Sequence, residues 1–121
     1  HYVFRFAQND VARLTRNERC LLQSIWRSGD YLNMVLQVLV KDQEHELSFI
    51  ETALRTNETN KKQTLMLTLY HDRKGDVEGF YQKFYLSVPL WHYKGILNKG
   101  DQIVFQLNTY KEGVIQRTFT Y

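Results

Sequence analysis

The stretch YLNMVLQVLVK at residues 31–41 decides the fold class of this 121-residue chain. Every second side chain in it is apolar, whereas the side chains between them are a mixture of polar, aromatic and aliphatic groups. Side chains on a β-strand alternate between two faces, so this pattern predicts a strand with one fully buried face. The triplet Ser28-Gly29-Asp30 just before it favours a turn, which predicts that a preceding element ends there. The apolar positions are Leu32, Met34, Leu36, Val38 and Val40.

The same two-residue alternation recurs on both sides of this stretch. Polar turn residues at 71–76 and at 98–101 each predict a hairpin between the runs that flank them. Many short strands separated by turns predict one all-β domain over residues 1–121, an antiparallel β-sandwich or barrel. Residues 9–26 and 45–54 also fit a short helix, because their apolar spacing is helix-like. The further strands are expected at residues 2–6, 64–70, 80–88, 91–97, 102–108 and 115–121.

Composition and charge exclude several classes of protein. Hydrophobic residues make up 43% of the chain, too many for a disordered protein, and charged residues at 24% interrupt the apolar runs too often for a membrane span. The net charge of +3 comes from scattered basic residues, so nothing predicts a nucleic-acid partner. The single cysteine, Cys20, excludes a disulfide scaffold and is expected to be a buried structural thiol. Asn57-Glu58-Thr59 is a glycosylation sequon, which predicts that Asn57 lies in an exposed loop.

No set of residues has the spacing that catalysis or metal binding needs. The histidines His45, His71 and His92 are far apart in the sequence and form no HxH or HxxxH pair. The carboxylates of Asp72 and Asp76 are expected to be solvated charges in a loop. Motifs for a serine nucleophile, a phosphate loop or a dinucleotide fold are absent from the sequence. The sequence therefore predicts a protein that is not an enzyme and that needs neither a metal nor another cofactor.

Aromatic residues make up 14% of the chain, a large share for one sandwich of this size. Four tyrosines, Tyr31, Tyr70, Tyr81 and Tyr85, fall on the parity opposite to the main apolar positions of their strands. Tyrosine combines a large contact area with a hydroxyl that tolerates water, so this second face could be buried against another subunit. The alternative is that these are scattered surface tyrosines.

The order of the two turns resembles that of the tumour necrosis factor ligand family. Ser28-Gly29-Asp30-Tyr31 opens a long strand that carries Gln37-Val38, LNKGDQI at residues 97–103 opens a later strand, and Phe119-Thr120-Tyr121 fits the last strand. The resemblance covers nearly the whole chain. It implies a jelly-roll fold, a homotrimer and a cysteine-rich receptor of the TNF-receptor type. It also implies an extracellular location, as a secreted protein or as the ectodomain of a type II membrane protein whose membrane segment lies outside this chain.

The resemblance further implies site residues. In the family, receptors lie in the grooves between subunits, and the loop between two central strands presents a tyrosine to them. Carried onto this sequence, the receptor contacts are Tyr70, His71, Asp72, Arg73, Arg13, Arg16, Tyr110 and Lys111. The residues at the trimer interface are Tyr31, Tyr93 and Tyr121.

Two alternative functions remain open. The related C1q-like globular heads, which recognise varied targets, carry much the same two turns. A monomeric β-sandwich or barrel that binds a small apolar ligand or a glycan is the other alternative, with Trp26 and Trp91 as stacking platforms. Tryptophans in a domain of this size also commonly lie in the core.

Overall fold

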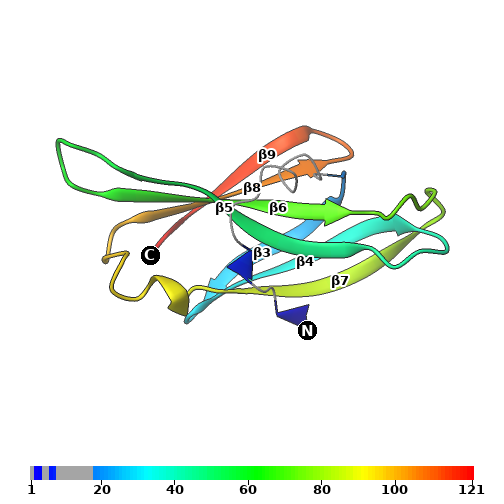
Figure 1. Ribbon diagram of the computed structural model, residues 1–121, viewed down its shortest axis with the longest axis horizontal. Coiled ribbons are helices and arrows are strands. Elements are labelled where there is room, and N and C mark those ends of the chain that lie inside the picture. The colour runs from blue at the N-terminus through cyan, green and yellow to red at the C-terminus, as the bar shows by residue number, and fades with distance from the viewer. Residues whose placement is uncertain (1, 4–5, 8–17) are drawn as a thin grey trace.

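The computed structural model describes residues 2–3, 6–7 and 18–121, and it shows two β-sheets packed face to face (Figure 1). One sheet has four strands in the order β1-β7-β4-β3, and the other has five in the order β2-β5-β6-β8-β9. None of the helical segments in the described residues is long and apolar enough to span a membrane. The elements are β1 Tyr2–Val3, β2 Phe6–Ala7, β3 Leu21–Ser28, β4 Tyr31–Val40, β5 Glu46–Thr56, β6 Gln63–Asp72, β7 Phe80–Pro89, the 3-10 turn η1 Trp91–Tyr93, β8 Gln102–Thr109 and β9 Gly113–Thr120.

Strand pairing departs from a purely antiparallel arrangement. The ladders β3–β4, β4–β7, β5–β6 and β8–β9 are antiparallel, whereas β1–β7, β2–β5 and β6–β8 are parallel. The predicted all-β sandwich is confirmed, but the jelly-roll topology is not, because jelly rolls are built from antiparallel strands. The hairpin expected between residues 64–70 and 80–88 is wrong, since β6 and β7 belong to different sheets. The chain therefore crosses the sandwich between these two strands.

The core lies between the sheets and draws side chains from both. The apolar parity predicted for residues 31–41 is confirmed, because its five inward side chains on β4 are each at most 5% exposed. Phe49 on β5 and Phe105 on β8 are completely buried in the same cluster. Burying apolar surface stabilises the fold by roughly 25 cal/mol per Å², so this cluster is the main source of stability.

Two segments that also fitted a helix form strands where they are described. β3 pairs with β4, and β5 pairs with β6 along its whole length. A bulge between Glu51 and Ala53 inserts one extra residue into β5, so the inward side chains before and after it are no longer two residues apart. The apolar spacing in such a strand imitates that of a helix, and only pairing with β6 decides between them.

The segment at residues 91–97, expected as a strand, is a 3-10 turn followed by irregular backbone. Pro89 ends β7, and the N–H of Tyr93 donates to the carbonyl of Leu90 at 3.0 Å. The turn at 98–101 is anchored to the start of β6, where the carboxylate of Asp101 accepts the backbone N–H of Gln63 at 2.9 Å. The hairpin predicted at this turn does not form, because the residues before the turn do not pair with β8.

Strands β3 and β9 each form one edge of their sheet, and they lie on the same side of the sandwich. At one end, the N–H of Cys20 donates to the carbonyl of Asn108 at 2.9 Å, and the N–H of Tyr110 donates to the carbonyl of Cys20 at 3.0 Å. At the other end, the guanidinium of Arg27 donates to the carbonyl of Thr120 at 2.7 Å. These contacts join the two sheets at both ends of their shared side.

Candidate functional site

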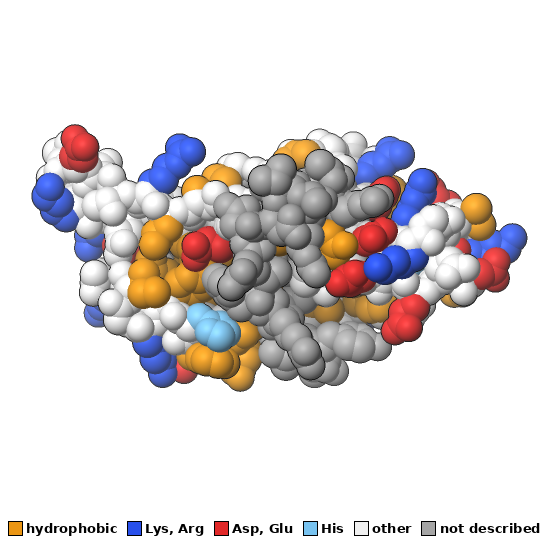
Figure 2. Space-filling view, in the orientation of Figure 1, with side chains coloured by type: hydrophobic (Ala, Val, Ile, Leu, Met, Phe, Trp, Pro, Cys, Tyr) orange, Lys and Arg blue, Asp and Glu red, His pale blue; other side chains and the backbone are white. Residues whose placement is uncertain are grey.

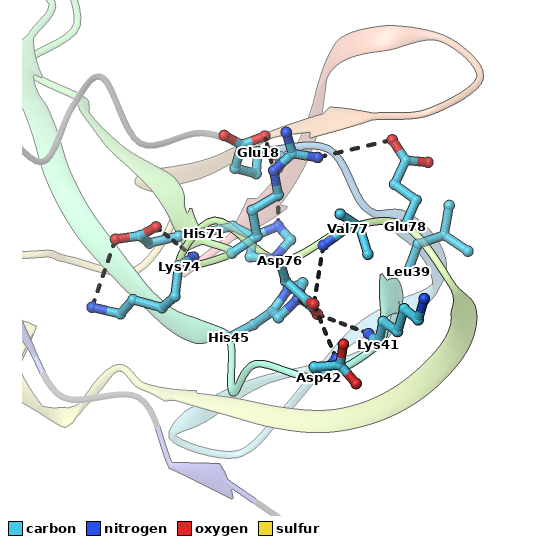
Figure 3. Close-up of polar contacts among 12 residues, drawn as sticks. Glu18, Leu39, Lys41, Asp42, His45, His71, Lys74, Asp76, Val77 and Glu78 are labelled. Atoms are coloured by element: carbon cyan, nitrogen blue, oxygen red, sulfur yellow. Dashed lines mark hydrogen bonds and ion pairs between the residues drawn. The ribbon is translucent and has the colours of Figure 1, made fainter.

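A buried polar cluster occupies the end of the sandwich where β4 and β6 finish (Figure 3). At its centre is Asp76, which lies in the β6–β7 connection and is 4% exposed. Its carboxylate accepts the backbone N–H groups of Lys41 at 2.8 Å, Asp42 at 3.0 Å and Val77 at 3.0 Å, and Nε2 of His45 lies 2.9 Å away. The backbone N–H of Asp42, followed by the other donors, holds the pKa of Asp76 well below its usual range, so this side chain is an anion.

A second histidine extends the cluster towards β3. Nδ1 of His45 lies 2.8 Å from Nε2 of His71, and Nδ1 of His71 lies 3.1 Å from the carbonyl oxygen of Glu18. His71, on β6, is 1% exposed, and this burial lowers its pKa to about 4, so its ring is neutral near pH 7. The hydrogen bonds thus connect the β4–β5 connection, the β6–β7 connection, β6 and the segment before β3.

Charged side chains of both signs surround this cluster at the surface, and Figure 2 shows them interspersed over that end of the molecule. They form ion pairs with distances between 3.1 and 4.0 Å. Exposed pairs of this kind contribute little to stability, because water screens them. The pairs are Arg73 with Glu18 and Glu78, and Lys74 with Glu46 and Asp72.

The position of this cluster changes the interpretation of residues 70–73, which were expected to face a receptor. Tyr70 is 6% exposed and His71 only 1%, while Asp72 and Arg73 are half-buried. The expectation that Asp76 is a solvated charge is wrong. Sequence spacing gave no signal for it, because apart from the adjacent N–H of Val77 the groups that bind Asp76 come from residues 41–45, more than 30 positions earlier in the chain.

A second candidate surface is the outer face of the four-stranded sheet. Trp26 on β3, Tyr31 on β4, and Tyr81 and Tyr85 on β7 are between 39% and 49% exposed. All four side chains lie on the outer face of the sheet. Tyr31 occupies an outward position of β4, and Trp26, Tyr81 and Tyr85 each pair with an outward position of that strand, Tyr85 with Val35. These four residues are called the aromatic face below. Three of its tyrosines were singled out by parity in the sequence, but Trp26 was not.

Tyr110, from the β8–β9 turn, supports the aromatic face at one edge. Its hydroxyl accepts the backbone N–H of Leu39 at 3.1 Å, and its ring meets that of Tyr81 edge to face at 6.1 Å. The pairing of β3 with β4 ends at Gln37, so the Tyr110 hydroxyl takes a donor on β4 beyond the reach of β3. Lys111 follows Tyr110 and lines a small open pocket of about 90 Å³ between the start of β3 and this turn.

The three tyrosines expected at a trimer interface occupy different environments. Tyr31 belongs to the aromatic face, whereas Tyr93 is 2% exposed in the core. Tyr121 is half-buried, and the guanidinium of Arg27 lies 4.9 Å from the centre of its ring. The structure therefore does not gather these residues on one surface.

Three further expected residues concern the surface and the start of the chain. Asn57 lies at the exposed tip of the β5–β6 hairpin, where its side-chain oxygen accepts the N–H of Thr59 at 2.9 Å. Glycosylation of Asn57 stays a prediction. Arg13 and Arg16 lie outside the described residues.

Metal binding and thiol chemistry also depend on the surroundings of the candidate side chains. In the described part of the chain, no group of three or more His, Cys, Asp or Glu side chains is placed to hold a metal ion. The 2.8 Å separation of the His45 and His71 nitrogens is a hydrogen-bond distance. Cys20 is completely buried, and its desolvation raises the thiol pKa to about 12, which makes it unreactive at neutral pH.

Two packed sheets, a buried polar cluster and an exposed aromatic face define an all-β sandwich domain. The chain belongs to the family of the NigD-like C-terminal beta sandwich domain, whose model matches residues 4–121. No curated protein matches the chain significantly.

Solved structures show the same architecture. A NigD-like immunity protein from Bacteroides caccae is 29% identical, with a TM-score of 0.76, and the match covers 99% of this chain and 64% of that one. Two others share the fold at lower identity. One is a protein of unknown function DUF1344 from Bacteroides vulgatus, which is 17% identical with a TM-score of 0.78, and the match covers 99% of this chain and 57% of that one. The other is a putative toxin related protein from Parabacteroides distasonis, which is 16% identical with a TM-score of 0.75, and the match covers 99% of this chain and 60% of that one. This chain thus spans between 57% and 64% of the length of these proteins.

The family match corrects the resemblance to the tumour necrosis factor ligands, which is wrong. The cytokine function, the TNF-receptor-type partner and the homotrimer were inferred from that resemblance and fall with it. The turns that carried it do form, with Gly29 at φ +57° and Gly100 at φ +95°. Glycine in such a turn reflects a backbone conformation that many β-sandwiches need, so it does not identify a family. The comparisons also give no support to a C1q-like head or to a domain for a glycan or small apolar ligand.

Proposed function

We propose that this domain is a noncatalytic protein-binding domain of an immunity protein, which neutralises a protein toxin by binding it. The proposal draws on the 29% identical structure, which is that of a NigD-like immunity protein. The observation that carries it is the aromatic face, with Trp26, Tyr31, Tyr81 and Tyr85 all between 39% and 49% exposed on one side of a sheet.

The chemistry of the aromatic face suits a protein partner. Tyrosine and tryptophan are enriched at protein interfaces because a rigid ring offers a large contact area at a small loss of conformational entropy. Tyr81 and Tyr85 are four residues apart on β7, about 13 Å along an extended strand, so the rings are spread over a broad surface. Val35 beside Tyr85 is 5% exposed, which shows that the rings already shield the sheet beneath them. A broad, ring-covered surface fits a partner that covers about 800 Å² of it.

The groups that could perform acid–base or nucleophilic chemistry support binding in place of catalysis. A catalytic acid or base must come within hydrogen-bond reach of a substrate. His45, His71 and Asp76 are buried and bonded to one another, and Cys20 is a buried thiol with a raised pKa. We therefore propose that the domain is not an enzyme.

The proposal is tested by binding to a purified protein toxin, and the first probe is the protein encoded beside the gene for this chain. Wild-type chain immobilised on a biosensor should bind it, and Trp26→Ala should weaken the binding by about 30-fold or more, because such aromatic residues dominate interface energies. A wild-type chain that leaves the activity of this toxin unchanged in a killing assay would contradict an immunity function.

The matched control is Val114→Ala. Val114 is 56% exposed on β9, in the other sheet, so its truncation removes exposed apolar surface away from the aromatic face. Its affinity for the toxin should equal that of the wild type. Equal losses in Trp26→Ala and Val114→Ala would place the binding surface elsewhere.

The location outside the cell and the single domain over residues 1–121 stay predictions. The exposed β5–β6 tip leaves the Asn57 sequon accessible, which is compatible with the first of them.

A further inference from the structure

We infer that His45 and His71 form a buried proton-binding site, which holds one proton more than two neutral imidazoles carry. This proton completes a chain of hydrogen bonds that joins the β4–β5 connection and the β6–β7 connection to Glu18, which precedes β3. The inference rests on hydrogen-bond geometry and is independent of the proposed function.

The groups at the two ends of the hydrogen-bond chain can only accept hydrogen bonds. At one end, the carboxylate of Asp76 already receives three backbone N–H groups, so it also receives the proton on Nε2 of His45. At the other end, the carbonyl of Glu18 has no proton to give, so Nδ1 of His71 donates to it. The 2.8 Å link between His45 Nδ1 and His71 Nε2 needs a proton of its own. Three links thus need three N–H groups, whereas two neutral imidazoles supply two.

The additional proton belongs on His45. Its Nε2 lies 2.9 Å from the anionic Asp76, whereas His71 faces a carbonyl and has a pKa lowered by burial to about 4. With this assignment, His45 and Asp76 form a buried ion pair, and His71 stays neutral with Nε2 as an acceptor. A buried ion pair is favourable only when the remaining polar atoms also have partners, and both ring nitrogens of His45 have one here.

Except for Tyr70, the other titratable groups around the site lie towards solvent. Water screens charges at such positions, so the buried carboxylate of Asp76 dominates the electrostatic environment of His45. The solvent-facing groups are Glu18 and Glu78 with Arg73, Glu46 and Asp72 with Lys74, and the exposed side chains of Lys41, Asp42 and Glu44. Tyr70 is buried, and its hydroxyl lies 3.5 Å from the carboxylate of Asp72.

The site makes the free energy of unfolding depend on pH, with a maximum near the ordinary pKa of histidine. In the unfolded chain each of the two histidines titrates near its ordinary pKa of about 6.5. Below that pH the unfolded chain binds two protons on these side chains and the folded chain one, so stability falls as the pH falls. Above it the unfolded chain binds none and the folded chain one, so stability falls as the pH rises. Each flank approaches about a tenfold change in the unfolding equilibrium constant per pH unit.

The protonation state is measured directly by ¹⁵N–¹H correlation spectra of the histidine rings of the uniformly labelled wild-type chain at pH about 6.5. Both ring nitrogens of His45 should carry a proton, and His71 should carry one on Nδ1 alone. Spectra of His45→Gln and His71→Gln assign the signals. A neutral His45 ring in the folded protein would overturn the inference.

The linkage is measured by urea unfolding between pH about 5.5 and 7.5, on either side of the ordinary histidine pKa and below the ordinary thiol pKa at which Cys20 of the unfolded chain would ionise. The wild type should show both flanks, and the double variant His45→Gln with His71→Gln, whose amides form hydrogen bonds but do not titrate, should lose both. His92→Gln, which replaces the exposed histidine on η1, should keep them. A wild-type profile without the alkaline flank would overturn the inference. Should the double variant fail to fold, the wild-type profile and the ring spectra still decide.

Discussion

The polar cluster around Asp76 and the aromatic face place their side chains in opposite ways. In the cluster, the carboxylate of Asp76 and the rings of His45 and His71 are buried and bonded to partners within the chain. On the aromatic face, the rings of Trp26 and Tyr85 are about half covered, although each offers a large apolar surface. In the polar cluster the hydrogen-bonding groups find their partners within the chain, whereas the aromatic face leaves contact area available.

The difference separates the determinants of stability from those of binding. A buried charge that loses its partner destabilises the fold, since its desolvation is no longer offset. A half-exposed ring that is removed changes the folded state little, but it takes away surface that a partner would cover. Substitutions in the two regions should therefore affect different measurements, in order of decreasing size as follows.

The largest effect is expected from His45→Ala. This substitution removes the histidine partner of Asp76 and the hydrogen bond at Nε2 of His71, so we expect the free energy of unfolding to fall by about 3 kcal/mol. Urea unfolding monitored by fluorescence measures it. A loss no larger than that of His92→Ala, on the surface, would show that the cluster contributes nothing to stability.

Trp26→Ala should produce the reverse pattern. We expect toxin binding to weaken by about 2 kcal/mol or more, close to 30-fold, while the free energy of unfolding changes by less than about 1 kcal/mol. Titration calorimetry and urea unfolding on the same preparation separate the two quantities. A variant that loses stability but keeps its affinity would remove the contrast between the regions.

Tyr110→Phe tests the support of the aromatic face. Loss of the hydroxyl leaves the backbone N–H of Leu39 without its acceptor, so we expect a stability loss of about 1 kcal/mol. Tyr81→Phe is the control, because it keeps the ring contact with Tyr110 and removes only an exposed hydroxyl. Equal effects of the two variants on the urea midpoint would argue against the support role.

The smallest effect is expected from Lys94→Ala. Lys94 and Asp30 form an ion pair at 3.2 Å, but their side chains are 63% and 46% exposed. Water and salt screen such a pair, so the free energy of unfolding should change by less than about 0.5 kcal/mol. A larger, salt-dependent loss would mean that exposed ion pairs contribute to the free energy of unfolding of this fold as buried pairs do.

The sequence predicted most strands because their side chains alternate strictly. The run at residues 31–41 corresponds to β4, and the run at 80–88 corresponds to β7. Residues 45–54 stayed ambiguous between helix and strand, since the bulge between Glu51 and Ala53 breaks the alternation. The strand predicted at 91–97 was wrong, because the backbone forms a 3-10 turn and irregular structure from which only Tyr93 and Leu97 reach the core, while Trp91 and Ile96 are about half exposed.

The candidate sites were predictable to different degrees. Parity placed Tyr31, Tyr81 and Tyr85 on a second face, and all three are exposed there. The same argument failed for Tyr70, which has the outward parity of β6 but is buried. Parity reports the side of a sheet on which a residue lies and carries no information about what covers that side.

The amino-acid sequence by itself determined that this chain forms a sandwich of short strands, because a period of two in apolar side chains is a local property that neighbouring residues impose. The tertiary structure alone decided which strands pair, which face stays open and how Asp76, His45 and His71 meet. These features depend on contacts between residues that lie far apart in the sequence: 26 residues separate the two histidines, and 31 separate His45 from Asp76. Such contacts leave no periodic pattern, since each partner is chosen by the folded backbone that brings it within hydrogen-bond distance.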